Sequence, residues 1–132
     1  MYRQIRVADE DLDFQRIFWR ESPDAELQHL RFLRVTFGTS SAPYLAVRCL
    51  QQLAHDEGSK FPLAVPKVLY EFYMDDLMSG CYTVAEGVQI YDQITALLKR
   101  GGFPLQKWSS NSVDLLNKIQ TDTKESNNSL VL

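Results

Sequence analysis

Two β-hairpin patterns alternate with two amphipathic helix patterns along this chain, and that order limits the folds available to it. Each hairpin pattern is a pair of short apolar stretches around a polar turn, at residues 14–37 and 68–81. The helix patterns follow at residues 42–53 and 84–98, and glycines end both. Because hairpins require antiparallel pairing, we expect an α+β fold with an antiparallel sheet in a split βαβ arrangement and helices on one face.

The individual elements follow from the spacing of apolar residues. The expected strands are residues 2–8, 14–19, 30–37, 68–73, 77–81 and 103–108, with a loop around Pro62 and Pro66. Residues 9–13 are expected to form an acidic turn or a single helical turn. The first helix should bury Ala42, Leu45, Ala46, Cys49, Leu50 and Leu53. The second should bury Val84, Val88, Tyr91, Thr95 and Leu98, and a short helix is expected at 112–120.

The ends of the second helix are marked by residues with a capping role. Thr83 and Glu86 have the spacing of a capping box, in which each side chain accepts a hydrogen bond from a backbone N–H at the helix start. Gly101 and Gly102 follow the last apolar residue, where helices commonly end. The sequence therefore predicts both limits of this helix.

Length and charge exclude several classes of protein. The chain has 132 residues, one domain's worth, and 14 Lys and Arg against 17 Asp and Glu give a formal net charge of −3. This balance excludes a strongly basic domain that holds nucleic acid by bulk charge. Two cysteines, Cys49 and Cys81, are too few for a disulfide framework. No apolar run approaches the ~20 residues of a membrane span and no signal sequence is seen, so we expect an intracellular protein without a membrane partner.

Two adjacent carboxylates, Asp75 and Asp76, are the sharpest chemical feature of the sequence. They stand at an expected hairpin tip, where both can approach one point in space, whereas in a regular strand they would face opposite ways. Mg²⁺ prefers oxygen ligands and is commonly held by one or two carboxylates plus substrate phosphates. The dipeptide alone is more typical of a solvated turn, so the metal hypothesis depends on its context.

Three motifs in a fixed order supply that context. Residues 37–43 read FGTSSAP, residues 73–76 read YMDD, and residues 102–108 read GFPLQKW. Together they resemble consecutive motifs of reverse transcriptases, and their wording is similar to polymerases of Pao/BEL-type LTR retrotransposons. The resemblance covers about residues 1–116. It implies a truncated palm with part of the fingers over residues 1–119, and the polar tail at 120–132 is expected to be disordered.

The resemblance implies two-metal transfer of a nucleotide to a primer 3′-hydroxyl, the reaction of an RNA-directed DNA polymerase. Mg²⁺, or Mn²⁺ in its place, would lower the pKa of that hydroxyl and stabilise the phosphoryl oxygens. Asp75 corresponds to the main metal ligand and Asp76 to its weaker partner. Lys107 corresponds to a lysine that assists the departure of pyrophosphate, with a solvated strand lysine as the alternative.

Five further residues correspond to nucleotide- or primer-binding positions of that family. Tyr73 and Met74 would lie near the primer end, and Tyr2 would lie under the sugar and exclude a 2′-hydroxyl. Phe37 would lie beside the incoming nucleotide, and Gly38 would let nucleotide and template approach closely. The alternatives are a core aromatic for Phe37 and a turn at the helix start for Gly38.

The first metal-binding Asp of the family would fall four residues before Met1 and is absent from this sequence. Asp9 lies seven residues beyond Tyr2, about 23 Å along an extended strand, and is a poor substitute. We therefore expect the isolated chain not to polymerise. In a parent polymerase it would bind an RNA or DNA template-primer and dNTP beside the remaining polyprotein segments, in the cytoplasm or a virus-like particle.

Two other interpretations stay open. A retained palm fragment could act without catalysis, as a module that binds nucleic acid or another protein. An unrelated α+β domain with an acidic turn is the least favoured of the three, because the three motifs occur in order on the expected elements.

Overall fold

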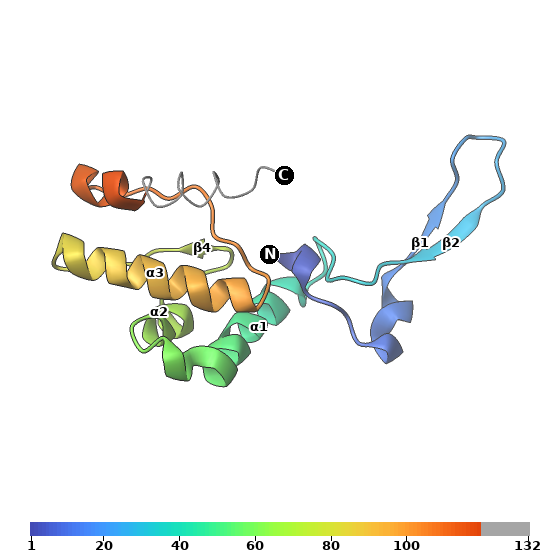
Figure 1. Cartoon of the computed structure of the whole chain (residues 1–132). Helices are drawn as coiled ribbons and strands as arrows, with labels where there is room; N and C mark the ends of the chain where they lie inside the picture. The colour runs from blue at the N-terminus through green and yellow to red at the C-terminus, as the bar shows by residue number, and fades with distance from the viewer. Residues whose placement is uncertain (120–132) are drawn as a thin grey trace, which may run out of the picture. The chain divides into compact units, whose positions relative to one another are not determined.

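The computed structural model describes residues 1–119 and divides the chain into two compact units (Figure 1). The first unit is Met1–Cys49 and the second begins at Leu50. The boundary falls inside helix α1, Ala42–Glu57, so this helix contributes residues to both units. The tail that we expect to be disordered lies outside the described residues.

The first unit is built around an antiparallel hairpin, as the sequence predicts. Strand β1, Arg16–Trp19, pairs with β2, Gln28–Arg31, and Ile17 lies opposite Leu30. Strand β1 begins two residues later than expected, because Phe14 and Gln15 belong to the 3-10 helix η2, Asp9–Gln15. Strand β2 covers only the first two residues of the strand expected at 30–37 and begins two residues earlier. Residues 9–13, expected to form a turn or a single helical turn, are the start of η2.

The strand expected at residues 2–8 is wrong over most of its length. Tyr2–Gln4 form the 3-10 helix η1, and the following residues make a single antiparallel bridge, between Arg6 and Arg34. A strand is held by hydrogen bonds to a neighbouring backbone. Only one bridge forms here, so the alternating apolar residues do not become a ladder.

An ion-pair cluster joins η2 to both strands of the hairpin. The carboxylate of Asp13 lies 2.9 Å from the guanidinium of Arg16 and 3.0 Å from that of Arg31. A hydrogen bond from Arg31, and to a smaller extent one from Arg16, holds the pKa of Asp13 below its usual value of 3.8. Exposed ion pairs of this kind contribute little net stability. The cluster therefore orients η2 against the hairpin more than it stabilises the unit.

The second unit packs three helices around an apolar core. They are α1, α2 (Ala64–Tyr70) and α3 (Val84–Arg100), and a 3-10 turn at Gly58–Lys60 connects the first two. Helix α2 lies directly against α3. The buried apolar side chains of this unit are Leu50, Ala54, Ala64, Val68, Ile90, Ile94, Leu97, Leu98 and Ile119.

Helix α2 replaces part of an expected loop and the first half of the strand expected at residues 68–73. Pro66 lies in the first turn of α2, where the N–H that proline lacks would have no partner within the helix. Ala64 and Val68 are four residues apart and both are buried, so they lie on the same face of the helix. The β-branched and aromatic residues of this stretch favour a strand locally, but packing against α3 selects the helix.

Helix α3 begins and ends where the sequence predicts. Its N-cap is Thr83, whose side-chain oxygen accepts a hydrogen bond from the N–H of Glu86 at 3.2 Å. It ends at Gly101, and Gly102 follows with a φ of +74°, a conformation that favours glycine. These local signals fix the limits of the helix but not which side it buries.

The buried faces of α1 and α3 differ in part from those expected. On α3, Leu98 is buried as expected, but its companions in the core are Gly87, Ile90, Ile94 and Leu97. On α1, Ala42, Ala46 and Leu50 are buried as expected, and Ala54 extends this stripe by one more turn. Leu45, however, is 38% exposed, and Cys49 and Leu53 are only partly buried. Each helix carries apolar residues on more than one side, and the packing partners decide which stripe is buried.

The second hairpin is short, and it does not join the first in one sheet. Strand β3, Phe72–Tyr73, pairs with β4, Asp76–Leu77. The strand expected at 103–108 is wrong, because that segment forms no ladder. Within residues 1–119 the strands form two separate two-stranded sheets, so the expected single sheet in split βαβ order is not present. The fold is mixed α+β with small antiparallel hairpins.

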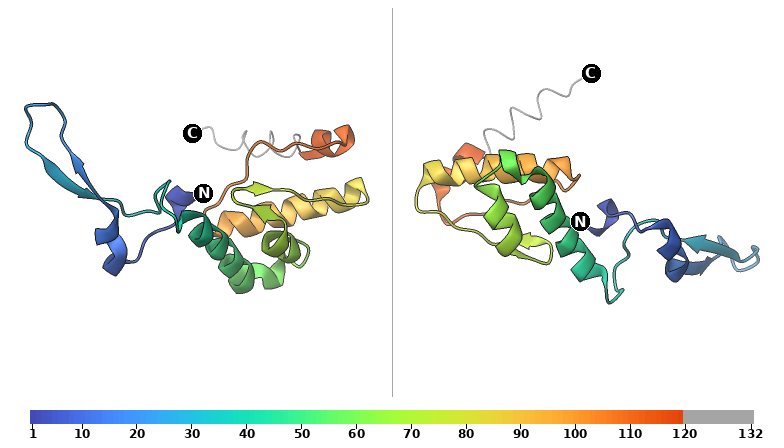
Figure 2. Two further views of the ribbon diagram at one scale, coloured as in Figure 1. Left: turned by 180° about the vertical axis from the view of Figure 1, so that it is seen from behind. Right: turned by 90° about the horizontal axis from the view of Figure 1, so that it is seen from below.

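A last helical stretch covers residues 113–119, in agreement with the expected short helix as far as the chain is described. It lies beside α3 (Figure 2), where Leu115 packs so closely on Gly87 that an added Cβ would come within 3.0 Å of the leucine. None of the helices in the described part of the chain combines the length and apolar character needed to cross a membrane.

Candidate functional site

A strained two-residue loop joins β3 to β4. Tyr73 pairs with Asp76, which leaves Met74 and Asp75 as the loop. Met74 has a φ of +55°, a region that costs a side-chain-bearing residue about 1–2 kcal/mol. Only the first loop residue has positive φ, the pattern of a type II′ hairpin turn. The tight connection between the two strands accounts for this conformation, and a methionine in place of the usual glycine makes it strained.

The two carboxylates at this turn are exposed. In residues 1–119, the side-chain carboxylates of Asp75 and Asp76 have no ion-pair or hydrogen-bond partner, although the backbone of Asp76 pairs with that of Tyr73. Two adjacent negative charges without a cation repel each other, and a divalent cation would relieve that repulsion. Carboxylate oxygens are also the ligands that Mg²⁺ prefers. The donor chemistry therefore fits a divalent cation.

The number of carboxylates is small for a closed metal site. No group of three or more His, Cys, Asp or Glu residues gathers anywhere in the described part of the chain. A cation held by Asp75 and Asp76 would therefore take its other ligands from water or from the phosphates of a bound molecule. That is the usual arrangement for Mg²⁺ at nucleotide sites.

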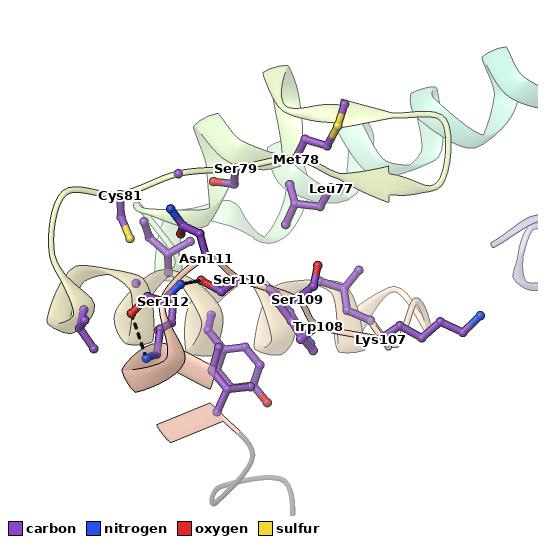
Figure 3. A pocket seen from close by; sticks show the side chains of 18 of the residues that line it. Leu77, Met78, Ser79, Cys81, Lys107, Trp108, Ser109, Ser110, Asn111 and Ser112 are labelled. Carbon is purple, nitrogen blue, oxygen red and sulfur yellow. Dashed lines mark hydrogen bonds between the residues drawn. The ribbon is translucent and has the colours of Figure 1, made fainter. Parts of the chain in front are cut away.

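The aspartates line a groove of about 900 Å³ in the second unit. Figure 3 labels ten of the other residues that line it. Its walls are residues 75–84, part of α3, the extended segment 105–112 and the helical stretch that follows. Lys107 lines the same groove, and Figure 3 shows its side chain extending away from Ser110 and Ser112. The residues that line the groove therefore include two carboxylates and one ammonium group.

Ring packing attaches the extended wall of the groove to α3, and one residue of that wall has a positive φ. The ring of Trp108 contacts that of Tyr91 on α3, with centroids 4.8 Å apart and planes at 70°. The preceding residue, Lys107, has a φ of +59°, outside the region of a β-strand. This backbone turn interrupts the strand expected at 103–108. Lys107 is exposed, as the alternative of a solvated lysine expects, although it does not lie on a strand.

Three candidate residues belong to the first unit. The rings of Tyr2 and Phe37 meet edge to face, with centroids 5.4 Å apart. Phe37 is 63% exposed, which contradicts the alternative of a core aromatic. Gly38 has a φ of +83°, and a Cβ added there would meet no described atom within 4 Å. Its backbone conformation accounts for the glycine, as expected for a turn at the helix start.

The structure therefore brings together some of the predicted residues. Asp75, Asp76 and Lys107 line one groove. Tyr73 and Met74 belong to the same hairpin but are not among the lining residues. The remaining candidates, Tyr2, Phe37 and Gly38, are placed only within the first unit.

Sequence reasoning missed two residues beside this hairpin, Lys67 and Glu71. They form an ion pair of 2.8 Å at the C-terminal end of α2. Their spacing of four residues is a known signal of helical side-chain pairing. The i, i+4 spacing has meaning only in a helix, whereas the sequence predicts a strand at 68–73.

Replacement of Met74 by glycine tests the strain in the loop. Glycine adopts positive φ without steric cost, so Met74→Gly should raise the free energy of unfolding by about 1 kcal/mol in urea titrations. Met78→Gly is the matched control, because Met78 is exposed and has no positive φ. The control should lose about 0.5–1 kcal/mol. Equal losses in both variants would show that Met74 is not strained.

In comparisons with known proteins, the chain matches no family model, no curated protein and no solved structure.

Proposed function

We propose that residues 1–119 are part of the palm and fingers of a reverse transcriptase similar to those of Pao/BEL-type retrotransposons. The observation that carries the proposal is the YMDD hairpin, whose two free carboxylates follow a residue with a φ of +55° and share a groove with Lys107. The order of the three sequence motifs supports it. The mixed α+β fold and the antiparallel pairing at YMDD are compatible with it.

In the proposed reaction, the 3′-hydroxyl of a primer attacks the α-phosphorus of a dNTP and pyrophosphate leaves. A bound Mg²⁺ or Mn²⁺ would supply Lewis-acid activation of the hydroxyl and the phosphoryl oxygens. Asp75 and Asp76 would hold the cation through their exposed carboxylates. Lys107 would offset the negative charge of the pyrophosphate from the same groove.

The other roles in this proposal come from the resemblance to the family. Tyr73 and Met74 would contact the primer end, in keeping with their position on the hairpin that carries the aspartates. Tyr2, Phe37 and Gly38 would bind the incoming nucleotide. The template-primer and the remaining segments of the parent polymerase are the partners that this function requires.

Metal titration tests the role of the aspartates. Asp75→Asn removes one of two carboxylates, so it should weaken Mn²⁺ binding by about tenfold or more, measured by electron paramagnetic resonance or calorimetry. Asp24→Asn is the control, because Asp24 is an exposed aspartate in the turn of the first hairpin. Identical Mn²⁺ affinities for the parent and Asp75→Asn would refute the metal site.

Primer extension tests whether the chain polymerises by itself. In the described residues the hairpin supplies two carboxylates, and two metals that share ligands need further oxygen donors. We therefore expect no extension of a DNA primer on an RNA template by the 132-residue chain with dNTP and Mg²⁺. A product above background that disappears in Asp75→Asn would contradict this expectation.

A second candidate function is a non-catalytic module that binds nucleic acid or another protein, and the β1–β2 hairpin favours it. All eight strand residues are exposed. One face presents Phe18 and His29, whose rings meet at 4.7 Å, beside Arg16 and Arg31. Aromatic rings beside arginines are typical of surfaces on which the bases of single strands stack.

Binding of a single-stranded RNA measured by fluorescence anisotropy tests this second candidate. Phe18→Ala removes a stacking surface and should weaken binding by about fivefold or more. Phe14→Ala is the matched control, since Phe14 is 86% exposed but precedes the strand. Equal affinities for Phe18→Ala and the parent would exclude this face, and light scattering would then test whether the exposed hairpin binds another protein chain.

A further inference from the structure

The hairpin that carries Asp75 and Asp76 is too short to hold its own shape. Each strand has two residues, and isolated two-stranded hairpins are marginally stable in water even when they are longer. The positive φ of Met74 adds strain to the loop. The geometry of the two carboxylates therefore depends on contacts outside the loop and its strands.

Those contacts lie at the open end of the hairpin. The N–H of Met78 donates to the carbonyl of Glu71 at 3.0 Å, which extends the strand pairing by one step. The ammonium of Lys67 donates to Oε1 of Glu71 at 2.8 Å and to the carbonyl of Gly80 at 3.2 Å. Lys67 thus connects both arms, since Glu71 precedes β3 and Gly80 follows β4.

The clamp, defined here as Lys67 and Glu71, is fixed to the core through α2. Lys67 belongs to that helix, and its neighbour Val68 is 2% exposed. Glu71 is the C-cap of α2, and its N–H donates to the carbonyl of Lys67. A helix that packs against α3 therefore carries both clamp residues. Because α2 is packed in the core, the contacts of Lys67 and Glu71 fix the two arms of the hairpin relative to that core.

The charges of the clamp are partly shielded from water. The side chain of Lys67 is 20% exposed and that of Glu71 is 31% exposed. Burial by itself would raise the pKa of Glu71, but hydrogen bonds from Lys67 and Ser79 and the positive charge of Lys67 outweigh it and hold that pKa below 4.5. The pair is thus charged at neutral pH, and removal of one partner leaves the other in a half-buried position without a counter-ion.

We propose that Lys67 and Glu71 are positioning residues that hold the aspartate-bearing hairpin in shape. Lys67 joins the arm before β3 to the arm after β4, and α2 anchors that junction to the core. The consequence for metal binding rests on the proposed function. The effect on the hairpin itself does not, because it is a property of the folded chain without metal.

Hydrogen exchange without metal tests the clamp directly. Lys67→Met removes the ammonium but keeps an unbranched side chain, and exchange of the Met78 amide should accelerate by about tenfold. Lys67→Arg can donate to the same two acceptors and should restore much of the protection. Lys60→Met is the matched control, because Lys60 is exposed and lies before α2. Amides in the middle of α3 should keep their protection in all variants.

Mn²⁺ titration of the same variants tests the consequence for the aspartates. Weaker binding by Lys67→Met with recovery in Lys67→Arg would support positioning of the carboxylates. Should Lys67→Met fail to fold, the double variant Lys67→Met/Glu71→Gln, which leaves no unpaired charge, replaces it in both measurements. Unchanged exchange at Met78 in the variant that folds would overturn the clamp. Absence of Mn²⁺ binding by the parent would instead overturn the proposed function and leave the exchange result to decide on the clamp.

Discussion

Burial of one stripe of α3 is the interaction on which the second unit depends. Ile94 and Leu97 have no exposed surface, and Leu98 has almost none. Side chains of this size contribute about 1.5–3 kcal/mol each when they leave water. Helix α2 packs against α3 and is too short to persist in isolation. The core therefore decides that this segment is a helix, and with it the place of every residue that α2 carries.

The candidate site is connected to that core through a short series of contacts. Val68 is buried, Lys67 is next to it in sequence, and the lysine contacts both arms of the β3–β4 hairpin. The strained loop at Met74 and the two aspartates lie at the far end of those arms. Neighbouring carboxylates repel each other, so a turn that is to hold a cation between them needs support from the rest of the fold. The proposed metal site thus requires a packed helix that provides none of its ligands.

Local signals in the sequence predict the elements that local physics controls. Thr83 caps α3 because its side chain reaches the N–H of Glu86, and Gly102 follows the helix in a conformation that other residues rarely adopt. The hairpin turn at Met74 and Asp75 is predicted as well, with one residue more than the loop contains. Failures occur where the outcome depends on distant residues. The strand expected at 103–108 finds no ladder partner in the described chain, and α2 forms where local composition favours a strand.

For the candidate site, the sequence alone determines that Asp75 and Asp76 are adjacent and lie at a turn, because both facts depend only on neighbouring residues. It also contains the three motifs that suggest a polymerase. Only the tertiary structure places Lys107 at the same groove as the aspartates and joins Lys67 to both arms of their hairpin. Those contacts connect residues far apart in the chain, and they exist because burial of the α3 stripe selects one packing among the several that the apolar pattern allows.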